Sequence, residues 1–246
     1  MNFKNIFLFL FILFWNSTTM NSQNAETLLQ KMDNVISAPK DREASVIMVM
    51  TDKNGKEKIR EASLKQKGRF KKLYRYTKPE KQAGIATLTL PDNVIWLYMP
   101  AFNKPMRISL LSKSQAFSGT DFSQEDMSGL PYSDRYSSKI IDSDSESYRI
   151  ELIPKNKKNK YSKIILTLNK TNFYPIKMEY FDKSDRYFKL ATYKYVKQGI
   201  YWYAKNVLMK SILKQHSTKI TFTAIKFDQG LSDDLFLVEN LKIIED

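Results

Sequence analysis

Short β-branched and aromatic runs recur along this chain, with turn residues between them. Asn54-Gly55 separates the runs 45–51 and 56–67, and Asn-Gly is the dipeptide most typical of a tight hairpin. Pro91-Asp92-Asn93 separates a run that ends at Leu90 from the run 94–98. Over the whole chain the pattern predicts about ten to twelve strands in one domain, and their hairpin connections make the sheet antiparallel. Such strands are typical of a sandwich or a barrel.

Residues 25–36 have a helical period, and Pro39 ends it. The apolar positions recur at three- and four-residue spacing: Leu28, Leu29, Met32, Val35 and Ile36. Ser123 and Asp126 have the spacing of a capping box, and Ser232 precedes another short helical turn. The sequence therefore predicts one long helix, which packs on the core, and one or two short ones.

Several segments are expected to connect strands or to extend the sheet. Residues 131–138 are a polar connection, 142–147 a turn, and 155–160 (KNKKNK) a solvated loop between the strands 148–153 and 161–168. Residues 108–111 have the pattern of a further strand.

The first residues have the layout of a secretory signal peptide. Lys4 precedes an apolar run, 6–15, which is short for a membrane span, and residues 16–25 are small or polar. We expect a signal peptide at 1–22, removed after Ser22 or Ala25, and a mature domain at 23–246; an uncleaved membrane anchor is the alternative. The chain has no cysteine, which excludes disulfides, thiolate metal sites and a lipidated cysteine. The expected location is the periplasm.

The formal net charge is +14. In a cytosolic protein this charge would suggest nucleic acid, but export argues against that partner. An anionic membrane surface or an anionic lipid is the more natural partner, and evenly spread solvated lysines are the alternative.

Residues 84–129 carry a resemblance to a known family. The order is G-x-A-x-L at 84–88, WLYMPA at 96–101, MRIS at 106–109 and FSGTDFSQEDM at 117–127. This order resembles the LolA-like outer-membrane lipoprotein-sorting proteins, and a looser similarity extends to Leu241. The resemblance implies a mainly β fold with some α. It would be a single unclosed, strongly curved antiparallel β-barrel with helices packed in its concave face and a hydrophobic cavity between them.

The resemblance also implies a function. It is that of a periplasmic carrier that binds the acyl chains of lipoproteins or lipids, as in outer-membrane lipoprotein sorting. Partners would be an inner-membrane transporter and an outer-membrane acceptor, with transient contact with the membrane surface and no nucleic acid. We expect a monomer without a cofactor. An envelope sensor or scaffold that binds a protein partner with the same fold is the alternative.

Aromatic and methionine side chains suit acyl chains, because the gain on burial is about 0.8 kcal/mol per methylene. The candidate cavity residues are Trp96, Tyr98, Met99, Phe102, Phe117, Phe122 and Met127. Each of them could instead fill the core. Both faces of the strand 94–99 are apolar, which predicts that something covers each side of it. Arg107 is expected to pair with Asp121 or Asp126, or to meet a lipid headgroup, and Asp121 is a candidate for the same polar contact.

Residues for catalysis are few. His216 is the one histidine, and no nucleophile-elbow glycine motif accompanies it, so we expect no enzyme and read His216 as a surface or strand-edge residue. Asp121, Glu125 and Asp126 invite a calcium site, but their spacing does not match an EF-hand loop, and helix capping explains Asp126. The sequence thus predicts no metal site.

Overall fold

The computed structural model describes residues 24–108 and 116–243, and in them one antiparallel sheet of thirteen strands dominates. The strands are β1 (Asp41–Thr51), β2 (Glu57–Lys67), β3 (Lys71–Lys78), β4 (Ala86–Leu90), β5 (Val94–Tyr98), β6 (Met106–Arg107), β7 (Tyr136–Ser143), β8 (Ser147–Pro154), β9 (Lys163–Asn169), β10 (Pro175–Phe181), β11 (Tyr187–Gln198), β12 (Tyr201–Ser211) and β13 (His216–Phe227).

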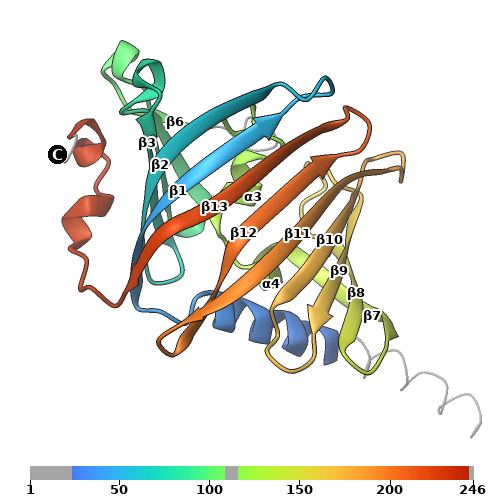
Figure 1. The fold of residues 1–246 in the computed structure, drawn as a ribbon. Helices are drawn as coiled ribbons and strands as arrows, with labels where there is room; N and C mark the ends of the chain where they lie inside the picture. Colours follow the sequence, from blue (N-terminus) through green and yellow to red (C-terminus); the bar gives the residue numbers. More distant parts are fainter. Residues whose placement is uncertain (1–23, 109–115, 244–246) are drawn as a thin grey trace, which may run out of the picture.

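The strand order is β6-β5-β4-β3-β2-β1-β13-β12-β11-β10-β9-β8-β7. Two series of strands, each paired in chain order, are therefore joined where β1 pairs with β13. The sheet curls strongly, but its edge strands β6 and β7 do not pair, so the barrel stays open (Figure 1). This architecture confirms the unclosed, curved antiparallel barrel that the resemblance implied.

The strand count exceeds the sequence prediction because of β7. Residues 131–138 were expected to be a polar connection, but β7 begins at Tyr136 and pairs with β8 as an edge strand. Tyr136 and Ser138 point inward and are buried, whereas most of the later residues of β7 are exposed. Edge strands tolerate polar residues on their open side, so the serine-rich composition hid this strand. At the opposite edge, β6 lies at Met106–Arg107, and residues 109–111 of the predicted strand 108–111 lie outside the described residues.

Helices cover the concave side of the sheet. The N-terminal helix, residues 24–36, crosses one open end of the curl (blue in Figure 1), and its stripe of Leu28, Leu29 and Met32 is buried in the main core. The short helices α3 (Gln124–Ser128) and α4 (Tyr132–Arg135) lie inside the curl. The predicted capping box is confirmed at α3: Ser123 Oγ accepts from Asp126 N, and Asp126 Oδ2 accepts from Ser123 N.

The C-terminal segment covers part of the convex side. Its 3-10 turns η5 (Asp233–Phe236) and η6 (Glu239–Lys242) bury Phe236 and Leu241 against the outer side of β3–β5. Tyr98 of β5 faces this second cluster, and Ile95 is fully buried on the same strand. The prediction that β5 is covered on both sides is thus confirmed. Ser232 caps η5, as its sequence predicts.

Four further 3-10 turns connect the strands: η1 (Glu80–Gln82), η2 (Pro91–Asn93), η3 (Pro100–Phe102) and η4 (Phe117–Gly119). In the part of the chain that the structure describes, no helix has the length and apolarity needed to cross a membrane. The predicted signal peptide, residues 1–22, lies outside the described residues.

Candidate ligand-binding cavity

A cavity of about 200 Å³ lies between the concave face of the sheet and its helical cover. The N-terminal helix contributes Ile36, α3 contributes Asp126 and Met127, and α4 contributes Tyr132. Most of the remaining wall comes from the sheet and from Tyr174 just before β10. Its aromatic and aliphatic side chains are Leu64, Tyr74, Tyr174, Met178, Tyr180, Tyr193, Tyr195, Trp202, Tyr203, Ala204, Val207, Ile220, Phe222 and Ile225. We call this space the aromatic cavity.

Tyrosine gives the aromatic cavity a specific chemistry. Burial raises the pKa of Tyr180, Tyr193 and Tyr195 well above the usual value, so their hydroxyls remain neutral donors. The Oη atoms of Tyr180 and Tyr193 both donate to Met178 Sδ, at 3.6 and 3.5 Å. Their polar ends are thereby largely occupied, and the rings present apolar faces to the cavity.

Two cations stand at one side of this cavity. Arg42 donates from Nε and Nη2 to Gln66 Oε1, at 3.0 and 2.6 Å. Lys72 Nζ donates to the carbonyl oxygen of Met127 at 2.7 Å and so links β3 to α3. Burial lowers the pKa of Arg42 to about 10, and burial followed by the charge of Arg42 lowers the pKa of Lys72 to about 7.

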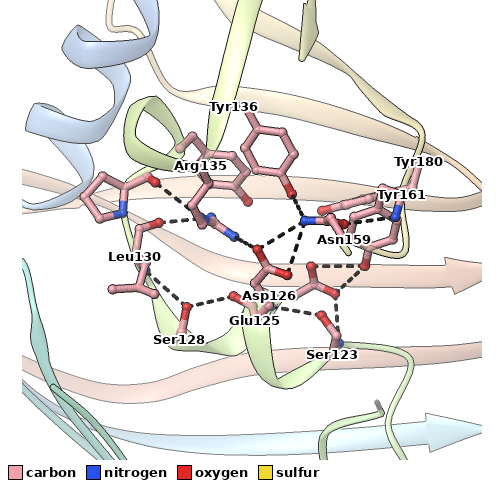
Figure 2. Close-up of polar contacts among 12 residues, drawn as sticks. Ser123, Glu125, Asp126, Ser128, Leu130, Arg135, Tyr136, Asn159, Tyr161 and Tyr180 are labelled. Atoms are coloured by element: carbon pink, nitrogen blue, oxygen red, sulfur yellow. Dashed lines mark hydrogen bonds and ion pairs between the residues drawn. The ribbon is translucent and has the colours of Figure 1, made fainter. Parts of the chain in front are cut away.

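A partly buried polar network joins α3 to α4 and to the loop between β8 and β9 (Figure 2). Glu125 forms an ion pair with Arg135 at 3.3 Å and accepts from Asn159 Nδ2 at 3.3 Å. Asp126 accepts from the Tyr161 hydroxyl at 2.8 Å. Asn159 was expected to lie in a solvated loop, but it is buried; residues 155–158 of that loop are exposed, as predicted.

The N-terminal helix holds the other end of the cover. The buried carboxylate of Asp33 accepts from the backbone N–H groups of Tyr132 and Ser133, at 2.9 and 2.8 Å. These are first-turn donors of α4, for which Pro131 supplies no side-chain cap. One carboxylate thus ties two helices together.

The contacts of Asp121 differ from the predicted pair with Arg107. Its Oδ2 lies 2.9 Å from His216 Nδ1 and accepts from the Thr218 hydroxyl at 2.7 Å, and its backbone oxygen accepts from Lys189 Nζ. Asp126 is bound to Ser123 and Tyr161, so the expected pair with Arg107 is wrong; Arg107 is exposed in β6. His216 is partly exposed at the start of the central strand β13, and it anchors the segment before α3.

The predicted cavity residues separate into three groups. Phe122 and Met127 line the aromatic cavity. Phe117 is buried beside it, with its ring edge-on to Tyr74 at 5.4 Å between centroids. The remaining residues lie on or near the β5 edge: Trp96 and Tyr98 pack in the C-terminal cluster, Met99 is partly exposed, and Phe102 is 63% exposed. Lipid contact by any of them stays a prediction.

Most of the cavity wall comes from β10–β13, which the sequence reasoning did not select. The sequence does contain a pattern that could have indicated this wall: the tyrosine pairs Tyr193/Tyr195 and Tyr201/Tyr203 are each spaced two residues apart, as on one face of a strand. The three acidic candidates for calcium, Asp121, Glu125 and Asp126, each bond to separate partners. In the residues that the structure describes, no group of three or more acidic or histidine side chains could hold a metal ion.

Comparison with known proteins identifies the family. A family model described as an uncharacterized protein matches residues 68–243. An outer membrane lipoprotein-sorting protein domain from Vibrio parahaemolyticus superimposes with a TM-score of 0.84 at 25% identity, over 91% of this chain and 100% of that one. The chain belongs to the family that this model describes, and it shares the LolA-like fold that its resemblance implies.

Two further solved structures support the same fold. A DUF1329 family protein from Desulfovibrio piger has a TM-score of 0.83 at 25% identity, over 90% of this chain and 99% of that one. A LolA superfamily protein from Nitrosomonas europaea has a TM-score of 0.73 at 21% identity, over 87% and 97%. A comparison with curated protein sequences finds no match.

Proposed function

We propose that this LolA-like protein is a periplasmic carrier that shields the acyl chains of a lipid or lipoprotein in the aromatic cavity. The observation that carries the proposal is the cavity itself, a largely apolar space between the concave sheet and three helices. Transfer would exchange one apolar environment for another and would need no bond chemistry. Each methylene buried contributes about 0.8 kcal/mol, which is about a fourfold gain in affinity.

The size of the cavity indicates that its cover must move. A volume of about 200 Å³ lies below the roughly 300–1,000 Å³ of typical small-molecule pockets. A long acyl chain therefore needs a wider space than this structure offers. The Lys72–Met127 hydrogen bond joins the cover to β3 above the cavity, so it is the contact that widening would break.

The hairpin between β11 and β12 supports contact with a membrane surface. Ile200 at its tip is 81% exposed, and Trp202, which also lines the cavity, is 42% exposed. Lys194, Lys197 and Lys205 are exposed beside them. Apolar side chains flanked by lysines suit an anionic lipid surface, and their position at the cavity would place the exit for an acyl chain next to the bilayer.

Bound lipid provides the first test. The purified protein would be extracted with organic solvent for mass spectrometry, and displacement of a fluorescent fatty-acid probe would be measured alongside. Ala204→Trp fills the cavity and should abolish probe binding, whereas Ala224→Trp, an equal change at an exposed position of β13, should leave it intact. Melting curves of both variants check the fold. Absence of lipid and of probe binding in the wild type would refute the carrier proposal.

The location needs a separate test. Export rests on residues 1–22, so we expect the protein in the periplasmic fraction with a new N-terminus close to Ala25. Fractionation and N-terminal sequencing decide this. Recovery with membranes and an intact Met1 would favour the uncleaved anchor instead.

A further inference from the structure

Arg42, Gln66 and Lys72 form a row across three neighbouring strands. Arg42 of β1 is in register with Gln66 of β2, and Gln66 is in register with Lys72 of β3. Side chains alternate along a strand, so these residues share a face with buried Ala44 and Leu64 of the main core. This row therefore lies on the concave face, and both of its cations line the aromatic cavity.

Neither cation has an anionic partner in the described part of the chain. Arg42 bonds to the neutral amide of Gln66, and Lys72 bonds to a backbone carbonyl. The carboxylate that lines the same cavity, Asp126, is bonded instead to Ser123 and Tyr161. Arg42 and Lys72 thus line one partly buried space without an anionic partner, an arrangement that a bound anion would stabilise.

This part of the aromatic cavity also has hydrogen-bond donors that are not used by the contacts above. Arginine has five N–H donors and lysine three, and the bonds above use two of the first and one of the second. Tyr74, which follows Lys72 on the same face of β3, is 5% exposed and lines the cavity. Its hydroxyl is buried and has no hydrogen-bond partner among the described residues. Buried polar groups rarely stay unpaired, so this hydroxyl also indicates a missing acceptor.

We propose that Arg42 and Lys72, with the hydroxyl of Tyr74, bind the oxyanion head of an anionic amphiphile whose acyl chain occupies the aromatic cavity. The inference rests on the carrier function proposed above and narrows its cargo. Carboxylates and phosphates accept hydrogen bonds from arginine and lysine in the required geometry. Cargo of this class is a fatty acid or a lipid phosphate, rather than an acyl chain held only through a neutral ester or amide.

Three amphiphiles with one chain length separate the head from the tail. Binding of dodecanoate, dodecyl phosphate and dodecanol to the lipid-free protein would be measured by calorimetric titration or probe displacement. We expect both anions to bind at least about tenfold more tightly than dodecanol, as charge-assisted hydrogen bonds would give. Inorganic phosphate alone should bind far more weakly than dodecyl phosphate.

Variants assign the effect to the row. Arg42→Gln and Lys72→Met should each reduce the preference for the anions toward unity, and melting curves of both variants check the fold. Lys219→Met, at an exposed position of β13, and Arg107→Gln, at the exposed edge, should keep the preference.

The outcomes separate the two proposals. If all three amphiphiles bind equally, or if Arg107→Gln alone removes the preference, the anion site is refuted and the carrier function survives. If inorganic phosphate binds as tightly as dodecyl phosphate, the assignment to an amphiphile is refuted. If no amphiphile binds at all, the carrier function itself fails.

Discussion

Replacing Asp33 with alanine tests how the helical cover is held over the sheet. The carboxylate is 5% exposed, and its two oxygens accept from the backbone N–H groups of Tyr132 and Ser133. Alanine removes both acceptors and leaves two first-turn donors of α4 without a partner. The N-terminal helix and α4 then lose the polar contact that fixes their relative position.

The size of the effect follows from these two bonds. A hydrogen bond to a charged group contributes about 1.5–3 kcal/mol, so the pair contributes about 3–6 kcal/mol. The variant also avoids the cost of burying a carboxylate, which favours the lower end. We therefore expect a loss of about 3 kcal/mol in the free energy of unfolding. In a chain of this length that corresponds to a fall in Tm of about 6–12 °C.

Urea denaturation followed by circular dichroism measures the loss, and two further variants calibrate it. Asp33→Asn keeps one neutral acceptor and should lose about half as much. Gln30→Ala changes an exposed position of the same helix and should stay within about 0.5 kcal/mol of the wild type. A loss below about 1 kcal/mol for Asp33→Ala would refute the view that this carboxylate ties the two helices together.

Three further substitutions test the cavity wall and its cover. Burial and the nearby charge of Arg42 lower the pKa of Lys72 to about 7, against about 10.4 in unfolded chains. The unfolded chain therefore binds an extra proton between these values, so urea midpoints should rise from pH 7 to pH 10 and should rise less in Lys72→Met. Met178→Ala opens a cavity at a fully buried position and should cost about 2–5 kcal/mol in denaturation, and a cost below 1 would show a wall that collapses freely. Gly129 ends α3 with φ of 72°, and an added Cβ would lie 3.4 Å from Lys72 Nζ, so Gly129→Ala should cost about 1 kcal/mol or more; an unchanged Tm would contradict this.

The sequence predicted the fold well where local signals and the hydrophobic period agree. The Asn54-Gly55 turn, the capping box at Ser123 and the end of the N-terminal helix before Pro39 depend on residues close in the chain. The edge strand β7 was missed because its serines and charged residues are typical of a loop as well as of a half-exposed edge. The central pair, β1 with β13, joins residues more than 160 positions apart, from Thr51↔Ser217 to Arg42↔Phe227, and no local pattern specifies such a partner.

The sequence predicted the site less completely than it predicted the fold. The residues around Trp96 were selected because the family resemblance is strongest there, yet Trp96 and Tyr98 pack beneath the C-terminal segment. A strand that is apolar on both faces does not reveal which face meets the cavity. The cations of the cavity were missed for another reason: Arg42 and Lys72 lie 30 positions apart in different strands, and only the register across β1–β3 brings them together on the inner face.

The contacts of α3 connect the anion site with the opening of the cavity. Toward α4 and the β8–β9 loop, α3 is held by partly buried carboxylates, in the Glu125–Arg135 pair and the Asp126–Tyr161 bond. Toward β3 it is held by the bond from Lys72 Nζ to the Met127 carbonyl, a neutral acceptor. An oxyanion beside Lys72 competes with that carbonyl for the same ammonium, and a charged acceptor forms the stronger bond. The side of the cover that is held less strongly is therefore the side that an anionic head would loosen, so the ligand that fits the cavity also favours the wider form that its acyl chain requires.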